Sequence, residues 1–213
     1  MKSPELKVEL LCIIDESGSM QSMVKEVIGG FNAFLKDQKA VPGEAKITLV
    51  KFDHEYMPQY EGVNLDMARD LTDATYCPRG TTALRDAVGR TLDKQGERIA
   101  KEGWADKVIV TIITDGYENA SKDYSTERIK EMTAHAEKHG WHFIYLGANQ
   151  DSWATAATLG INANALSNSV KTFAYTSAGV TASMASASLD TTNYRTHKPV
   201  AKQSTDDLLG GKQ

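Results

Sequence analysis

Three polar side chains alternate at the point where the first apolar run of the chain stops. Residues 10–14 lead directly into Asp15, and Ser17 and Ser19 follow at alternate positions. Gly18 lets the backbone turn tightly between the two serines. A carboxylate and two hydroxyls this close together offer the hard oxygen ligands that a divalent cation such as Mg²⁺ prefers. The alternative is that the serines cap the helix that follows, and on this stretch alone the cap is the simpler explanation.

Two later segments could complete a metal site. The stretch 78–84 reads Pro-Arg-Gly-Thr-Thr-Ala-Leu and places Thr81 and Thr82 just before a helix. The most hydrophobic strand signal in the chain, residues 107–114, stops at Asp115. This is again a carboxylate at the end of a buried strand, so the interpretation depends on whether the fold brings these segments together.

Hydrophobic periodicity indicates the elements that must position these residues. Strands are expected at 10–14, 45–52, 56–60, 107–114, 141–146 and 163–169. Helices are expected at 20–35, 65–71, from 84 onward, 125–139, 151–159 and 176–195. Gly29-Gly30 interrupts the first helix and lowers its stability unless something packs close there. Pro58 confines the third strand to an edge of the sheet.

The order of these elements predicts an α/β fold. We expect a doubly wound, Rossmann-like, mostly parallel sheet with one antiparallel edge strand and helices on both faces. In such sheets, ligands bind at the carboxyl ends of the strands, near the switch in strand order. Asp15, the Thr81-Thr82 loop and Asp115 all fall on that edge, which favours a shared site over a simple helix cap.

Composition narrows the classes of function. The 213 residues carry a net charge of −4, with 41% hydrophobic and 24% charged residues. No basic footprint points to nucleic acid, and no apolar run is long enough to predict a membrane span or an export signal. Cys12 and Cys77 are expected to be free thiols in a reducing compartment. Residues 1–195 are expected to form one domain and 196–213 a flexible tail, in which Leu208-Leu209 is the only apolar pair after Val200.

Common catalytic motifs are missing from the sequence. It has no Gly-x-Ser-x-Gly elbow, no P-loop and no dinucleotide fingerprint. His135 and His139 have no third metal ligand at suitable spacing. An aspartyl-phosphate mechanism at Asp15 needs a second carboxylate two residues later, where this chain has Ser17. We therefore expect no catalytic residues. The tryptophans are expected to be packing residues: Trp104, Trp141 and Trp153.

The three polar segments together resemble the von Willebrand factor A-type domain, over roughly residues 6–195. Asp15-x-Ser17-x-Ser19 matches the first motif of the metal-ion-dependent adhesion site (MIDAS) of that family. The Gly-Thr-Thr-Ala-Leu stretch at 80–84 is similar to the second motif, and Thr114-Asp115-Gly116 is similar to the third. Within the family, the chain most resembles small, free-standing bacterial and phage members.

The resemblance implies a role for each residue. Ser17 and Ser19 would bind the metal directly, and Thr82 would bind it directly or through water. Thr82 fits the Gly-x-Thr-x-Leu pattern of the family better than its neighbour Thr81. Asp15 and Asp115 would hold metal-bound waters and supply negative charge. The ion would be Mg²⁺, with Mn²⁺ or Ca²⁺ possible, and an acidic side chain of another molecule could replace one of its waters.

The expected function is a non-enzymatic, Mg²⁺-dependent protein-interaction module that docks an Asp or Glu of a partner protein. Its expected location is the cytoplasm of a bacterium or of an infected host, or a virion. One alternative is a structural or assembly protein, for example of a phage particle, in which the metal site is auxiliary. Another is a Mg²⁺-dependent hydrolase. Residues 116–117 and 150–153 are expected at the rim of the site, and the sequence leaves the oligomeric state open.

Overall fold

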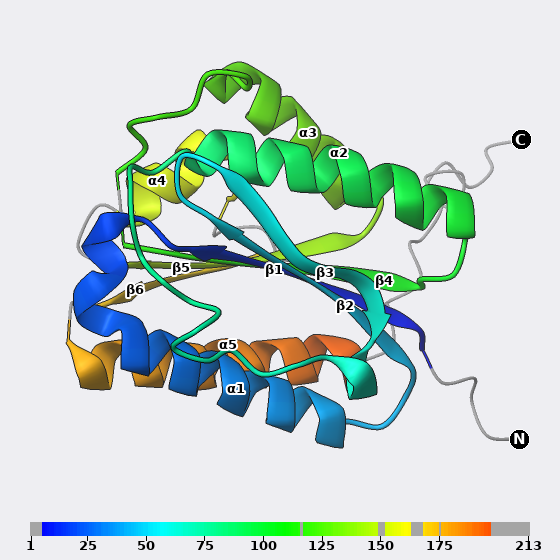
Figure 1. Ribbon diagram of the computed structural model, residues 1–213. Coiled ribbons are helices and arrows are strands. Elements are labelled where there is room, and N and C mark those ends of the chain that lie inside the picture. Colours follow the sequence, from blue (N-terminus) through cyan, green and yellow to red (C-terminus); the bar gives the residue numbers. More distant parts are fainter. Residues whose placement is uncertain (1–5, 116, 149–151, 163–167, 175, 197–213) are drawn as a thin grey trace, which may run out of the picture.

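The computed structural model describes residues 6–115, 117–148, 152–162, 168–174 and 176–196, and the fold is a sheet between two layers of helices (Figure 1). Six strands form one sheet in the order β3-β2-β1-β4-β5-β6. The strands are β1 Val8–Asp15, β2 Ala45–Phe52, β3 Tyr56–Asn64, β4 Lys107–Thr114, β5 Trp141–Ala148 and β6 Asn168–Phe173. The α-helices are α1 Val24–Ala40, α2 Leu84–Glu102, α3 Thr126–Lys138, α4 Ser152–Thr158 and α5 Ser177–Thr196.

The predicted fold class is confirmed. β1 pairs in parallel with β2 and with β4, and the parallel pairing continues through β5 to β6. Only β3 runs antiparallel among the described strands, at the edge beside β2, and it carries Pro58 as the sequence predicts. The register between β2 and β3 shifts on both sides of Leu49.

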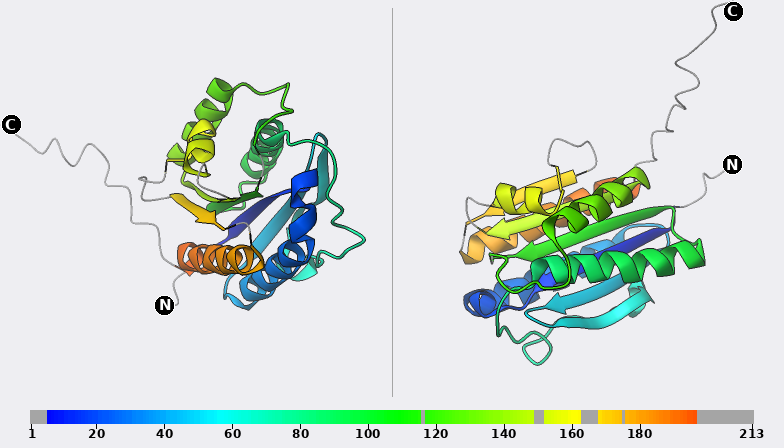
Figure 2. Two further views of the ribbon diagram at one scale, coloured as in Figure 1. Left: turned by 90° about the vertical axis from the view of Figure 1, so that its left-hand side faces the viewer. Right: turned by 90° about the horizontal axis from the view of Figure 1, so that it is seen from above.

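Each face of the sheet is covered by its own set of helices, as the left-hand view of Figure 2 shows. Alternate residues of β1 therefore enter two different cores. Leu10, Cys12 and Ile14 belong to the cluster under α1 and α5, whereas Leu11 and Ile13 belong to the cluster under α2, α3 and α4. All eight residues of β1 are buried, which explains why this strand has no polar alternation.

The first helix begins later than predicted and packs closely against α5 at one of its two glycines. A 3₁₀ turn, η1 Gly18–Met23, precedes α1. A Cβ added at Gly30 would lie 2.7 Å from Cγ of Met184 in α5, whereas one at Gly29 would meet nothing within 4 Å. Close packing at Gly30 therefore accounts for one of the two glycines.

The predicted helix at 65–71 is wrong. Only a 3₁₀ turn forms there, η2 Leu65–Met67, and Ala68 is already extended. The amide of Leu71 donates to Oδ1 of Asn32, 2.8 Å away in α1. A long-range hydrogen bond to α1 thus takes the place of the local helical bonds that the sequence favoured.

The last described elements are a strand and a helix. β6 lies at 168–173, later than the predicted strand at 163–169, of which residues 163–167 lie outside the described residues. The closing helix is confirmed as α5, and its buried Arg195 donates to the backbone oxygen of Gln38 at 2.6 Å. No helix within the described residues is long and apolar enough to cross a membrane. The expected tail from 197 onward also lies outside them.

Candidate metal centre

The site lies where the strand order reverses, between the carboxyl ends of β1 and β4. Ile14 is paired with Ile113, so Asp15 falls beside Thr114. The Asp15 side chain is fully buried and both of its oxygens are engaged. Oδ1 accepts the amide hydrogen of Ser17 at 2.7 Å, and Oδ2 accepts the hydroxyl hydrogen of Thr114 at 2.5 Å. Asp15 therefore shapes the turn and does not face solvent itself.

A chain of oxygens leads from this turn across to β4. Oγ of Ser17 lies 3.2 Å from Oγ of Ser19, and the Ser19 hydroxyl donates to Oδ1 of Asp115 at 2.7 Å. The other carboxylate oxygen, Oδ2 of Asp115, is buried and has no hydrogen-bond partner among the described residues. A buried carboxylate oxygen without a partner beside two hydroxyls is the donor set that a hard cation completes. The residues thus fit a divalent metal.

The threonine loop is held against the serine turn by backbone hydrogen bonds. The amide of Gly18 donates to the oxygen of Gly80 at 3.2 Å, and the amide of Arg79 donates to the oxygen of Glu16 at 2.8 Å. Thr82 is 3% exposed, whereas Thr81 is exposed. Of the two threonines, Thr82 is the one enclosed by the loops that form the site.

Two carboxylates at one edge make the electrostatics unfavourable without a cation. Burial raises the pKa of Asp15 to about 6, and the nearby charge of Asp115 acts in the same direction. The hydrogen bonds from Thr114 and Ser17 oppose this rise in pKa. A divalent cation at the site would stabilise the ionised form of both carboxylates.

Comparison with known proteins assigns the fold to a family. A profile of the von Willebrand factor type A domain matches residues 8–159. The chain belongs to this family. No curated protein sequence matches the chain significantly, so the comparison rests on the family profile and on solved structures.

Three solved structures illustrate the likeness in fold. Proximal thread matrix protein 1 from the mussel byssus has a TM-score of 0.57 at 12% identity, over 87% of this chain and 46% of that one. A von Willebrand factor type A protein from Catenulispora acidiphila has a TM-score of 0.54 at 15% identity, over 86% and 42%. The chain therefore spans less than half the length of these two proteins.

The third structure matches along nearly its whole length. The von Willebrand factor domain of the type V pili tip protein Mfa5 from Porphyromonas gingivalis has a TM-score of 0.57 at 13% identity, over 93% of this chain and 99% of that one. The mussel protein has also been solved with zinc in its MIDAS motif. At these identities the likeness establishes the fold alone.

Glu16, inside the first MIDAS motif, has a structural role that sequence reasoning missed. Its buried carboxylate accepts two hydrogen bonds from Nζ of Lys51, at 2.8 and 2.9 Å, and a short one from the amide of Cys77. Its own amide donates to the oxygen of Phe52 at 2.6 Å. Glu16 thereby ties β1, β2 and the loop before Thr82 together. A lysine inside an apolar strand was the available signal, since a buried lysine needs a partner.

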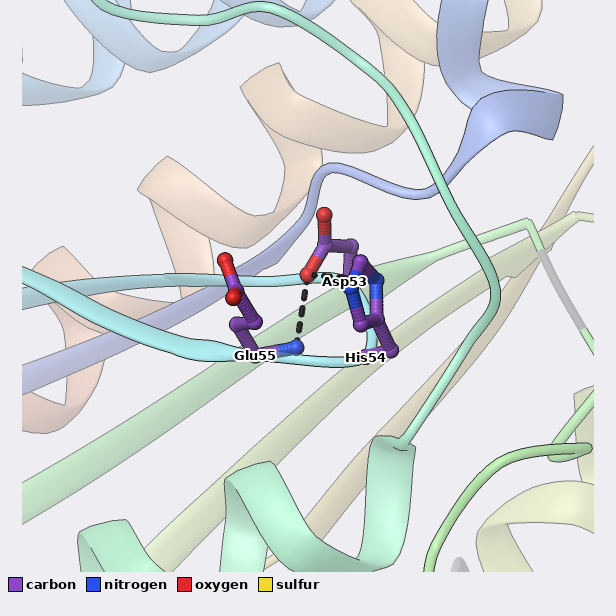
Figure 3. A group of neighbouring side chains, drawn as sticks. All are labelled: Asp53, His54 and Glu55. Carbon is purple, nitrogen blue, oxygen red and sulfur yellow. Dashed lines mark hydrogen bonds and ion pairs between the residues drawn. The ribbon is translucent and has the colours of Figure 1, made fainter.

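A second group of carboxylates lies close by, at the end of β2. Side-chain ligand atoms of Asp53, His54 and Glu55 lie within 4.8 Å of one another (Figure 3). The guanidinium of Arg79 already bridges the two acids, from Nε to Asp53 at 3.1 Å and from Nη2 to Glu55 at 2.5 Å. The backbone oxygen of Asp53 also accepts the amide hydrogen of Ala83 at 2.8 Å. The charge of Arg79 thus balances the two acids, and the cluster anchors the loop that carries Thr81 and Thr82.

The loop after β4 is fixed to the start of α2 by a further buried carboxylate. Asp86 accepts hydrogen bonds from the amides of Lys122, Asp123 and Tyr124, at 2.8, 3.0 and 3.0 Å. Asn119 completes the attachment, because its Oδ1 accepts the amide hydrogen of Thr82 at 2.9 Å. None of these partners was predicted, because nothing local in the sequence distinguishes them from solvated polar residues.

The predicted rim of the MIDAS is described only in part. Tyr117 is 64% exposed and Trp153, in the first turn of α4, is 54% exposed. Gly116, Gln150 and Asp151 lie outside the described residues. The packing role expected for Trp153 is therefore wrong. Trp104 and Trp141 are half-buried, and Nζ of Lys46 lies 4.7 Å from the Trp104 ring.

Proposed function

We propose that the chain is a non-enzymatic, Mg²⁺-dependent interaction module whose MIDAS docks an acidic side chain of a partner protein. The observation that carries this proposal is Oδ2 of Asp115, which has no partner among the described residues and is buried beside the Ser17–Ser19–Asp115 chain of oxygens. Family membership supports a metal-dependent interaction module in general. The choice of Mg²⁺ and the acidic ligand are the specific parts of the proposal.

The residues would hold the metal in two ways. Ser17, Ser19 and Thr82 would supply neutral hydroxyl oxygens, whereas Asp15 and Asp115 would act through metal-bound waters and their charge. A metal with few anionic ligands remains an electrophile that attracts a carboxylate from another molecule. Mg²⁺ suits this role because it keeps several exchangeable waters. Mn²⁺ and Ca²⁺ could substitute, and the mussel relative has been solved with zinc.

The state of Asp15 supports binding over catalysis. A phosphoryl-accepting aspartate needs an accessible oxygen, but both oxygens of Asp15 accept hydrogen bonds within a fully buried turn. No side chain described at this edge pairs a nucleophile with a general base in the manner that covalent catalysis requires. We propose the bacterial or infected-host cytoplasm as its location, where the thiols of Cys12 and Cys77 would stay reduced.

Calorimetry with Mn²⁺ tests the metal site. Wild type should bind one ion, and Ser17→Ala/Ser19→Ala should bind it at least tenfold more weakly. Ser22→Ala, which removes an exposed hydroxyl of the same 3₁₀ turn, is the matched control and should bind as wild type does. Equal affinity in wild type and the double variant would remove the site as assigned.

Selection from a peptide library tests the docking step. Peptides captured in Mg²⁺ and released by EDTA should share one Asp or Glu, and replacing that residue by Asn or Gln should abolish capture. Thr82→Ala should weaken peptide binding more than it weakens Mn²⁺ binding, because the docked state depends on coordination geometry. Peptides that bind equally well in EDTA would rule out a metal bridge.

A further inference from the structure

A second candidate site lies at the opposite edge of the sheet, away from the MIDAS. α2 and α3 run side by side over one face (Figure 1), and between them lies a groove of about 810 Å³. The groove reaches the amino-terminal ends of the strands, because Lys107 begins β4 and Trp141 begins β5. Its volume falls in the range of sites that enclose a ligand or a short peptide segment. The apolar part of its lining consists chiefly of Leu92, Ile99, Val108, Met132, Ala136 and Trp141.

The lining of this groove includes Gly96, a glycine that packing among the described residues does not require. Gly96 lies inside α2, where glycine weakens a helix relative to alanine. A Cβ added at Gly96 would meet nothing within 4 Å. Gly89, two turns earlier in the same helix, differs because Tyr124 fills the space that its Cβ would take. Packing among the described residues thus explains Gly89 but not Gly96.

α5 covers the other face of the sheet, but its carboxyl end reaches the same end of the sheet as the groove. The hydroxyl of Tyr194, near the end of α5, donates to the oxygen of Gly140 at 2.9 Å, directly before Trp141. Nζ of Lys107, which lines the groove, donates to the backbone oxygen of Tyr194. The last described residue, Thr196, comes two positions later. The described chain therefore ends near the amino-terminal ends of β4 and β5, on the face of the sheet opposite the groove.

The sequence after α5 has the composition and length to fill it. Leu208 and Leu209 are the only adjacent apolar residues after Val200. The twelve residues that follow Thr196, up to Leu208, can span up to ~40 Å when extended, at about 3.3 Å per residue. The 19 residues of α2 extend over only ~28 Å, at about 1.5 Å per residue. The segment is therefore long enough to pass around the end of the sheet and bring the two leucines to Ile99, near the carboxyl end of α2.

We propose that the groove binds the C-terminal segment of the same chain, with Leu208 and Leu209 against Ile99 and Met132. The two acids that precede the leucines, at 206–207, would face Arg128, which is exposed on the α3 wall of the groove and lies 3.7 Å from Glu131. Because the segment is tethered, its effective concentration is in the millimolar range, so weak apolar contacts suffice to hold it. This proposal is independent of the metal site.

Methyl nuclear magnetic resonance on the full chain tests the contact directly. With labelled Leu, Ile and Met methyl groups, Leu208 and Leu209 should show nuclear Overhauser effects to Ile99 and Met132. Leu208→Asp/Leu209→Asp should abolish them and shift the Met132 methyl and Trp141 indole signals. Val200→Asp, a matched apolar-to-acid change in the same segment, should leave these signals in place.

Gly96 provides the complementary test from the groove side. Gly96→Leu should fill the groove and release the segment, so that the Leu208 and Leu209 methyl shifts move to random-coil values. Gly96→Ala should leave them as in wild type. Random-coil shifts for both leucines in wild type would overturn the proposal. Overhauser effects that appear only between differently labelled molecules in a mixed sample would overturn it in favour of a second copy as the occupant.

Discussion

Asp15→Asn should stabilise the metal-free protein at neutral pH and remove part of its pH dependence. Burial raises the pKa of Asp15 from 3.8 to about 6. Between these two values the folded protein holds a proton that the unfolded chain has released, so the free energy of unfolding falls as the pH rises. A difference of roughly two pKa units corresponds to about 3 kcal/mol. This stabilisation is fully present below pH 4 and is lost as the pH rises through 6.

The assay is urea unfolding in EDTA at pH 4, 5, 6 and 7.5. Asparagine keeps the shape of the side chain and can still accept the amide hydrogen of Ser17 through Oδ1, as Asp15 does. The variant should therefore gain up to about 3 kcal/mol on wild type between pH 4 and 7.5. Saturating Mg²⁺ should stabilise wild type at pH 7.5 by mass action and reduce the difference. A difference between the two proteins that stays constant with pH would refute the reasoning, and Asp70→Asn, at an exposed carboxylate, controls for general charge effects.

Three further outcomes follow from individual contacts. His142→Phe should make the free energy of unfolding less dependent on pH in acid. Burial lowers the pKa of this histidine from 6.5 to about 4. Wild type should therefore lose up to about 3 kcal/mol relative to the variant as the pH falls from 6.5 to 4. Gly30→Ala should lower the free energy of unfolding by about 1–3 kcal/mol, because the new methyl group overpacks against Met184. Gly29→Ala should raise it by about 0.5–1 kcal/mol. Equal shifts in melting temperature for the two variants would contradict the packing argument. Arg79→Lys should weaken Mn²⁺ binding by about two- to fivefold in calorimetry, because a partly exposed ion pair contributes only ~0.2–1 kcal/mol; an unchanged affinity would show that backbone bonds alone hold the loop.

Local patterns in the sequence predict the architecture and the polar residues at its edge. Parallel strands end at the same side of a sheet, so placing Asp15 and Asp115 at two strand ends already implies that they are neighbours. The pairing of β1 with β4 up to Ile14 and Ile113 confirms this proximity, and Ser19 contacts Asp115 directly. Whether these residues and Thr82 bind a metal stays a prediction.

Such local patterns could not predict the pairings between charged side chains that lie far apart in the sequence. Glu16 meets Lys51, and Asp53 meets Arg79, across 35 and 26 positions of sequence. Neither pairing has a periodic signature, although both position the loops of the site. The helix predicted at 65–71 was wrong for the same reason. Its local helical hydrogen bonds compete with a hydrogen bond to Asn32 that only the folded chain provides.

The antiparallel edge strand has a consequence for crowded conditions. An unpaired strand edge is a template on which a second molecule can extend the sheet, and such extension leads to fibrils. Pro58 removes one hydrogen-bond donor from β3, and the register shifts on both sides of Leu49 in β2 make the pairing of β3 irregular. Glu61 adds a charge that another copy of the same strand would have to bury. This edge should therefore resist self-association even at the high local concentrations of an assembling complex.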